Sequence, residues 1–171
     1  MRLRELEPDG VARDAALCVI QRLVVMCSAL GAAPPPTAEL TTMPLYRRVR
    51  ELAAYAIESK PLAGTRSVED RVKDVADVLD REAEALTRGE PATALEAVLQ
   101  GAVARDKLDR GEELAATELA LLVGYDRDAV LALAKAIPGG KRADKLPGKP
   151  WRFRASKALR AWLDERLARA R

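Results

Sequence analysis

Basic side chains gather near the C-terminal end of this 171-residue chain. The stretch from Lys135 to Arg160 holds nine lysines and arginines and a single acid, Asp144. Residues 112–171 carry 13 basic against 8 acidic side chains, whereas residues 1–111 carry 16 against 18, so the formal charge of +3 is unevenly distributed. A concentration of this kind predicts affinity for a polyanion, and a merely solvated surface is the alternative interpretation.

Side chains for acid–base or metal chemistry are scarce. The chain has no histidine, which removes the commonest general base and the commonest zinc ligand. Aspartate and glutamate are plentiful, but no pair stands apart from the charge pattern of exposed helices. A nuclease with acidic magnesium ligands is the one enzymatic alternative that stays open. We therefore expect a protein that is not an enzyme and that has no cofactor.

The two cysteines, Cys18 and Cys27, lie nine residues apart in a stretch that predicts a helix. This separation directs the two thiols to opposite sides of the helix, so they cannot pair with each other. We expect buried, free thiols in a reducing cytoplasm. Acids occupy the first residues where a secretory signal needs an apolar run, and two polar residues interrupt the apolar segment 15–33. Neither a signal peptide nor a membrane span is therefore expected.

Four helices are predicted in residues 1–111 from the spacing of apolar side chains. The first begins after Asp9 or Gly10 and stops at Gly31. So much of its surface is apolar that we expect it either at the centre of the core or in a subunit interface. The other three are predicted from Thr42 to Pro61, from the N-cap Ser67 to Leu86, and from Pro91 to Arg110. Gly111 follows as the candidate domain boundary.

The segment 116–135 has the residue sizes that two short helices crossing at a steep angle require. Ala120 is small where the helices approach, and Gly124 can adopt the left-handed conformation of a tight turn. Asp126 is placed to cap the second helix. A generic helical hairpin is the alternative, but it has no need of the alanine and glycine pair. Core positions are predicted for Leu119, Val123, Tyr125, Val130 and Leu133.

A loop rich in glycine, proline and lysine follows from Pro138 to Pro150 and leads into the extended stretch 151–154. Alternation along a strand predicts that Trp151 and Phe153 face the core while the two arginines between and after them face outward. Ser156 is placed to cap a last helix. The apolar stripe of that helix is Leu159, Trp162, Leu163 and Leu167.

Together these pieces resemble the MerR-like and excisionase-like winged helix-turn-helix proteins of bacteria and their phages. The resemblance covers about 60 residues: the two-helix unit 118–135, the basic loop, and Trp151-Arg152-Phe153-Arg154 running into Ala161-Trp162-Leu163. It implies a mainly α fold class, with an N-terminal helical bundle in residues 1–111 and a C-terminal winged helix-turn-helix in residues 112–171.

In that family the second helix enters the major groove of double-stranded DNA and the wing lies along the backbone or in the minor groove. The resemblance therefore implies that Arg127, Asp128, Ala132 and Lys135 lie near bases. Phosphate contacts are implied for Lys141, Arg142, Lys145, Lys149, Arg152 and Arg154. The presumed recognition helix has few side chains that hydrogen-bond to base edges, and Leu131 and its alanines offer only apolar contact to thymine methyl groups.

The function predicted from the sequence is that of a DNA-binding protein, either a transcriptional regulator or an accessory factor of a phage or mobile element. A homodimer through the N-terminal helices is expected, because two linked modules add their binding energies, and a protein partner is the other expectation. The apolar second helix supports an alternative, a winged-helix adaptor that binds protein instead of DNA. Charge reversal at Lys141, Arg142 and Lys145 discriminates between the two.

Overall fold

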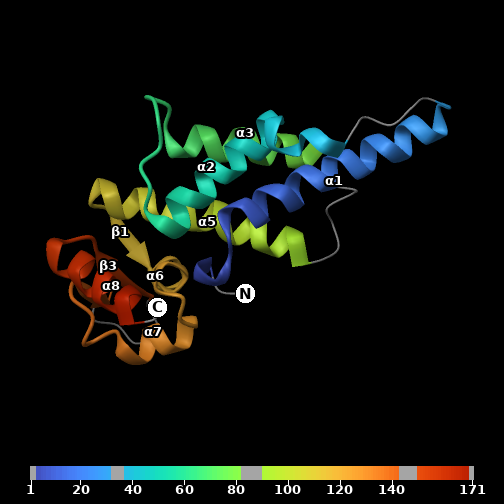
Figure 1. The fold of residues 1–171 in the computed structure, drawn as a ribbon. Helices are drawn as coiled ribbons and strands as arrows, with labels where there is room; N and C mark the ends of the chain where they lie inside the picture. The colour runs from blue at the N-terminus through green and yellow to red at the C-terminus, as the bar shows by residue number, and fades with distance from the viewer. Residues whose placement is uncertain (1–2, 32–36, 82–89, 143–149, 170–171) are drawn as a thin grey trace.

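The fold is known from a computed structural model that describes residues 3–31, 37–81, 90–142 and 150–169. In these ranges the chain is mainly helical, with one small three-stranded sheet near the C-terminal end (Figure 1). The N-terminal elements are η1 (Leu3–Glu5), α1 (Pro8–Ala29), η2 (Thr37–Thr42), α2 (Pro44–Glu58), α3 (Val68–Arg81) and α5 (Glu90–Arg110). The C-terminal elements are β1 (Glu113–Ala115), α6 (Ala116–Val123), α7 (Arg127–Leu133), β2 (Gly140–Arg142), β3 (Trp151–Arg154) and α8 (Lys157–Arg169).

Local sequence signals account for most helix ends. Helix α1 starts at Pro8, two or three residues earlier than predicted, because proline is well tolerated in the first turn. Ser67 caps α3 as expected, since its Oγ accepts a hydrogen bond from the Asp70 N–H at 3.1 Å. The predicted ends of the first, second and fourth helices are confirmed to within three residues. Leu86, on the predicted third helix, lies outside the described residues.

Buried apolar side chains form two clusters that meet in α5. The N-terminal cluster joins α1, α2, α3 and α5 around the fully buried Val49, Leu52, Val75 and Val98. The C-terminal cluster contains residues of the sheet and of α6, α7 and α8, and it also takes Ala104 and Leu108 from α5. Helix α5 therefore contributes to both cores, and the buried residues change from one cluster to the other between Ala102 and Ala104.

Helix α1 is packed along its first half and projects beyond the other helices at its far end (Figure 1). Among the described side chains of α1, the last buried one is Ile20, and Leu30 beyond the end of the helix is 80% exposed. Cys18 and Cys27 are free thiols, as predicted, but both are half-buried, so the prediction of buried cysteines was wrong. None of the helices in the described ranges combines the length and the apolar character needed to cross a bilayer.

A polar junction ties the last helix to the N-terminal helices. Tyr55 of α2 donates its O–H to Oδ2 of Asp109 in α5 at 2.7 Å. Arg160 of α8 reaches Oδ1 of the same carboxylate at 3.3 Å and also donates to the Asp109 carbonyl at 3.1 Å. The Arg105 side chain lies mostly buried beside them, and this burial lowers its pKa although Asp109 and Asp164 act in the opposite direction. One carboxylate thus joins three helices.

We expect Tyr55→Phe to lower the free energy of unfolding by about 1 kcal/mol near neutral pH, because it removes the hydroxyl and keeps the ring. Burial, followed by the hydrogen bond to Asp109, raises the pKa of Tyr55 above its ordinary value of 10.0. A phenol with a raised native-state pKa stabilises the fold fully below the unfolded pKa, and this stabilisation is lost as the pH rises above it.

Urea unfolding of the wild type and of Tyr55→Phe, from neutral to alkaline pH, measures the difference in their free energies of unfolding. The difference between wild type and Tyr55→Phe should be constant up to about pH 9 and should shrink above about pH 10. A difference that grows with alkaline pH would contradict the role given to this hydroxyl.

Candidate nucleic-acid interface

The segment 116–133 is broken into two helices at Gly124, as the sequence predicts. Gly124 has a φ of +72°, and its N–H donates to the Ala120 carbonyl at 2.9 Å. The Tyr125 N–H reaches the same carbonyl at 3.1 Å. A residue with a side chain adopts this left-handed conformation only at a cost, so glycine suits the turn. Leu119 and Val123 are buried below it, as predicted.

The core face of α7 differs from the prediction. Val130 is fully buried as expected, but Leu133 is 37% exposed, and Leu131 is half-buried against the C-terminal cluster. The reason is that Ala134, four residues after Val130, takes the next core position and is fully buried. The prediction of a buried Leu133 was therefore wrong, and Leu131 is only partly exposed for the contact predicted for it.

The two ends of α7 also differ from the prediction. Helix α7 stops at Leu133, so Lys135 lies in the turn that follows and is not on the helix. Asp126 occupies the N-cap position with extended backbone, but its side chain makes no capping hydrogen bond. The Asp126 side chain is exposed instead.

The outer face of α7 combines one pair of opposite charges with several methyl groups. The side chains of Arg127 and Asp128 are 61% and 91% exposed, and Arg127 Nη1 lies 3.9 Å from Asp128 Oδ1. Such an exposed pair contributes little to stability and leaves both groups able to bind a partner. Ala129 and Ala132 are exposed further along the helix.

The sheet has strand order β1-β3-β2, and both pairings are antiparallel. On its inner face Leu114 lies opposite Phe153, and both are fully buried. The rings of Trp151 and Phe153 stack with their centroids 6.4 Å apart, and Trp151 is half-buried. The predicted alternation along residues 151–154 is confirmed, because Arg152 and Arg154 are exposed on the opposite face.

Two like charges face each other on the outer side of this sheet. Lys141 of β2 is paired directly with Arg152 of β3, and Ala115 of β1 lies on the other side of Arg152. Directly opposed residues on antiparallel strands project from the same face, close to each other. Arg154, at the end of β3, is instead opposite Glu113. The basic centre of the sheet is therefore Lys141 and Arg152.

Glu118 lies close to this basic centre and is ionised. Its Oε2 accepts the Ala115 N–H at 2.7 Å, and Lys107 Nζ lies 2.5 Å from Oε1. Burial acts to raise the pKa of Glu118, but the hydrogen bonds from Lys107 and Ala115 and the charge of Arg152 lower it below its ordinary value. This carboxylate fixes the start of α6 and reduces the positive field on one side of Arg152.

The turn between α7 and β2 packs directly on β3. The Arg154 N–H donates to the Gly139 carbonyl at 3.1 Å, and Gly139 has a φ of +77°. A Cβ at Gly139 would meet the Arg154 carbonyl oxygen at 2.7 Å. This close approach of two backbones positions β2 and therefore Lys141.

Neither strand β1 nor strand β2 is predicted from the sequence. Strand β1 has three residues and one buried side chain, Leu114, so it is too short to show an alternating pattern. The only signal was an isolated leucine between the glycine that ends α5 and the next helix. Strand β2, residues 140–142, falls in the segment that we assigned to a loop.

Seven of the ten predicted contact residues have described side chains, and all seven are exposed: Arg127, Asp128, Ala132, Lys135, Lys141, Arg152 and Arg154. Arg142 belongs to β2 and pairs with Trp151. Lys145 and Lys149 lie outside the described residues.

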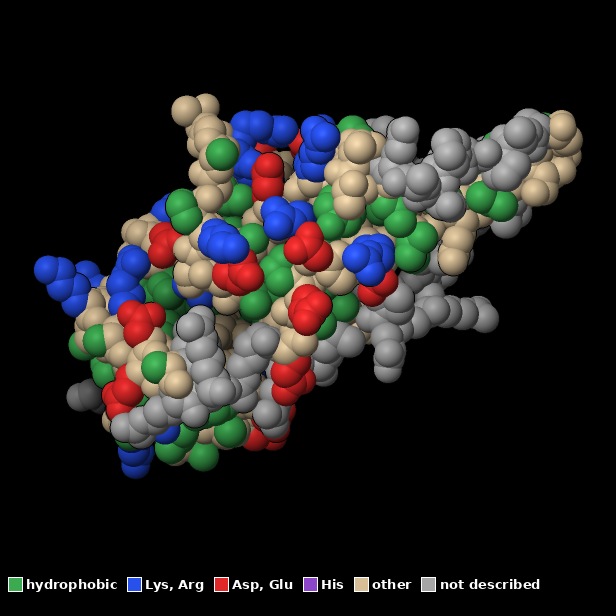
Figure 2. All heavy atoms as spheres, in the orientation of Figure 1, with side chains coloured by type: hydrophobic (Ala, Val, Ile, Leu, Met, Phe, Trp, Pro, Cys, Tyr) green, Lys and Arg blue, Asp and Glu red, His purple; other side chains and the backbone are tan. Residues whose placement is uncertain are grey.

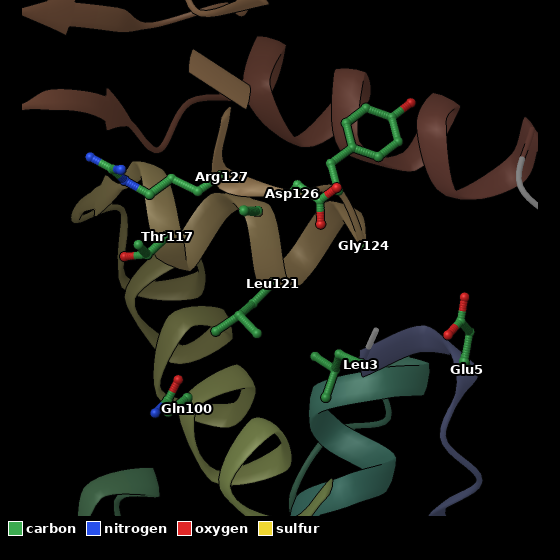
Figure 3. A pocket seen from close by; sticks show the side chains of 10 residues that line it. Leu3, Glu5, Gln100, Thr117, Leu121, Gly124, Asp126 and Arg127 are labelled. Carbon is green, nitrogen blue, oxygen red and sulfur yellow. The ribbon is translucent and has the colours of Figure 1, made fainter. Parts of the chain in front are cut away.

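A groove of about 490 Å³ separates the α6–α7 turn from the N-terminal segment (Figure 3). Leu3 and Glu5 of η1 form one wall, and Thr117 and Leu121 of α6 lie across from them. Arg127 lies at the edge of the same groove. The groove lies on the side of the turn that faces the bundle, and the outer residues of α7 are left exposed.

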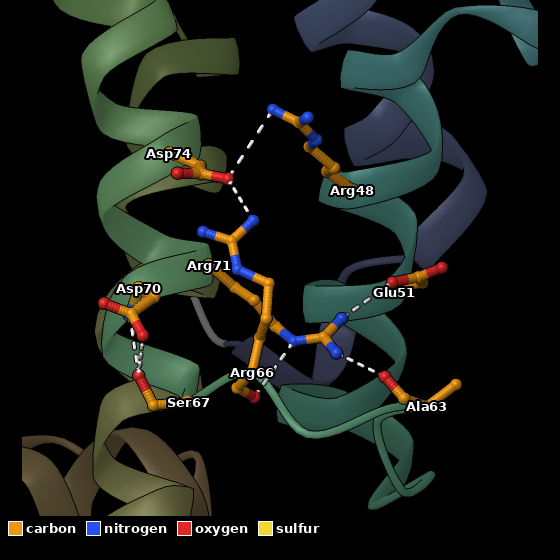
Figure 4. A network of polar contacts seen from close by, with 8 residues as sticks. All are labelled: Arg48, Glu51, Ala63, Arg66, Ser67, Asp70, Arg71 and Asp74. Atoms are coloured by element: carbon orange, nitrogen blue, oxygen red, sulfur yellow. Dashed lines mark hydrogen bonds and ion pairs between the residues drawn. The ribbon is translucent and has the colours of Figure 1, made fainter.

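A second group of arginines forms ion pairs with carboxylates (Figure 4). These arginines lie on α2, on α3 and on the segment between the two helices. Arg66 pairs with Asp74 at 2.7 Å, and Arg71 pairs with Glu51 at 3.1 Å. Arg71 also donates to the Ala63 carbonyl. Acidic and basic side chains are similarly interspersed over the face of the bundle that Figure 2 shows. These arginines hold the segment between α2 and α3 and are poorer candidates for an anion site than Lys141 and Arg152.

No family model matches the chain, and comparison with curated proteins and with solved structures gives no match either. Within the described ranges no group of three or more acidic or cysteine side chains is arranged to hold a metal ion.

Gly139→Ala and Gly111→Ala form a matched pair because both glycines have a φ near +80°. Each substitution adds a left-handed Cβ, which costs about 1–2 kcal/mol. At Gly111 a Cβ meets nothing within 4 Å, whereas at Gly139 it meets the Arg154 carbonyl oxygen. We expect Gly139→Ala to lower the free energy of unfolding by about 1–3 kcal/mol more than Gly111→Ala, as overpacking does. Urea unfolding followed by circular dichroism measures both, and equal losses would contradict the close packing of this turn.

Proposed function

We propose that residues 112–171 are a winged helix-turn-helix unit that binds double-stranded DNA. In this proposal α7 enters the major groove, and the hairpin of β2 and β3 lies on the sugar–phosphate backbone as the wing. The order of elements supports it: a short strand, two helices joined by a glycine turn, a two-stranded hairpin and a final helix. The resemblance to MerR-like and excisionase-like proteins, seen in the sequence, points in the same direction.

The pairing of Lys141 with Arg152 is the observation that carries the proposal. Like charges placed directly opposite each other in a sheet are destabilising. A phosphate bound between the two side chains would replace this repulsion with two charge-assisted contacts. The excess of basic residues in 112–171 provides the attraction over longer distances that brings a polyanion to this surface.

Residues 1–111 are proposed to link two copies of the DNA-binding unit, or to bind a protein partner. A single unit of this size buries limited surface on DNA, and two linked units add their binding energies. The apolar far end of α1, with the exposed Leu30 beyond it, is the part that we propose for self-association. Such a protein would act in the cytoplasm as a transcriptional regulator or as an accessory factor of a phage or mobile element.

Charge reversal tests the DNA-binding surface. We expect the double variant Lys141→Glu, Arg152→Glu to bind a duplex of about 30 base pairs about tenfold more weakly or worse. The slope of log affinity against log salt should decrease in magnitude by about 1.8, because two phosphate contacts are lost. The control is Arg13→Glu, Arg47→Glu, which makes the same change in charge at two exposed arginines of α1 and α2.

Fluorescence anisotropy with a labelled duplex, between about 50 and 200 mM salt, measures both quantities. The control pair should retain most of the wild-type affinity and the wild-type slope. Wild-type affinity that does not change with salt would exclude the basic sheet as the contact.

The exposed methyl groups of α7 support a second candidate, a winged-helix adaptor that binds protein. Ala129 and Ala132 are exposed, and so is Leu133, and such a surface also suits the apolar centre of a protein interface. Under this alternative the Lys141 and Arg152 reversal leaves the protein complex intact, and no salt-dependent binding to duplex DNA is seen.

A further inference from the structure

Beyond Arg127 and Asp128, the outer face of α7 has no group that can hydrogen-bond to a base. Its exposed side chains after these two are those of Ala129, Ala132 and Leu133. Hydrogen-bonding side chains on this helix are confined to its first turn, where Arg127 and Asp128 lie side by side. Burial of Val130 and Ala134 fixes which side of the helix faces outward. The fold therefore sets the apolar character of the part of this face that follows Asp128.

A face of this kind can read one feature of the major groove. Each base pair presents a pattern of donors and acceptors there, and thymine adds a C5 methyl group. Alanine and leucine neither donate nor accept hydrogen bonds, so they gain from contact with that methyl and from little else. A cytosine amino group or a guanine carbonyl placed against them would lose water without a replacement partner, which is costly.

We propose that α7 selects DNA by thymine methyl groups at the base pairs that face Ala129 and Ala132. This inference rests on the proposed function and adds the substrate class, duplexes with thymines at two neighbouring positions. Ala129 and Ala132 are three residues apart, about 4.5 Å along the helix axis, so their methyl groups are close enough to reach neighbouring base pairs. We assign the two thymine methyl groups to adjacent base pairs.

In this proposal the sheet and α7 contribute different parts of the binding. Lys141 and Arg152 contact phosphates and contribute affinity that does not depend on sequence. The alanines of α7 contribute discrimination but little affinity, because each methyl contact buries a small area. We therefore expect the protein to bind DNA strongly, in a way that weakens with salt, and to show a moderate preference for sequence.

The test begins with the full-length protein and a library of random duplexes, from which the bound fraction is selected. The preferred duplex is then prepared with deoxyuridine in place of thymidine at one position at a time, which removes only the methyl group. We expect affinity to fall about fourfold at each of two adjacent positions, the value for losing one buried methyl group, and to stay unchanged elsewhere.

A second series separates the methyl group from the rest of the base pair. At the two sensitive positions, a pair of 5-methylcytosine with guanine should bind about fourfold more tightly than the unmethylated pair. The salt dependence should be the same for all these duplexes, because the phosphate contacts do not change.

The variant Ala132→Asn places an amide on the same face and should abolish discrimination between thymine and uracil at one of the two positions. Ala161→Asn, at an exposed alanine of α8, is the matched control and should leave both positions sensitive. Circular dichroism of both variants verifies that the fold is retained.

Each outcome bears on a separate claim. Equal affinity for thymine and uracil duplexes, with binding that still weakens in salt, overturns the methyl readout and leaves the proposed function standing. Selected duplexes with guanine–cytosine pairs at the recurring positions have the same consequence. Failure to bind any duplex at low salt overturns the proposed function together with this inference.

Discussion

Helix α5 has to serve two hydrophobic cores at once, and the rest of the structure depends on this. Its first part packs into the N-terminal cluster through Val98 and its neighbours, and its last turns pack into the C-terminal cluster through Ala104 and Leu108. Small residues make this dual role feasible. Gly101, between the two parts, leaves room for Leu3, whose methyl group would lie 2.5 Å from a Cβ at that position. The N-terminal segment can therefore settle where the two clusters meet.

The orientation of the proposed DNA-binding surface follows from this shared helix. Only two residues separate the end of α5 from the start of strand β1, so the sheet begins next to the end of this helix. Helix α8 is held to the same helix by Arg160 and Asp109, and Asp109 is held in turn by Tyr55 of the bundle. Both ends of the C-terminal unit are thus tied to α5. In a dimer joined through the N-terminal helices, these ties would set the separation of the two recognition helices, and therefore the spacing of two half-sites on DNA.

Net positive charge and methyl groups lie on different parts of the C-terminal unit. The sheet presents Lys141 and Arg152 to solvent, while α7 presents alanine and leucine beyond the opposed charges of Arg127 and Asp128. A recognition helix with several arginines or amides for base edges would combine both properties, whereas under the proposed function affinity and selectivity belong to different elements. It also explains why a protein-binding role is the natural competitor, since an apolar helix face is useful in both settings.

Features encoded in adjacent residues could be predicted from the sequence. The helix ends near Pro44, Ser67 and Gly111 follow from local backbone chemistry, and so does the break at Gly124. The alternation from Trp151 to Arg154 is likewise a property of any half-buried strand. These signals act within a few residues and do not require knowledge of what packs against them.

Tertiary structure decided whatever depends on a partner distant in the sequence. The three residues of β1 become a strand only because β3, which starts 36 residues after β1 ends, offers its edge and the Phe153 ring covers Leu114. The outward turn of Leu133 follows from Ala134 taking the core position, and local spacing alone favoured the larger side chain. The opposition of Lys141 and Arg152 is set by the register of two strands. Sequence patterns determine which residues can form elements, whereas the pairing of surfaces determines which side chains are left facing outward.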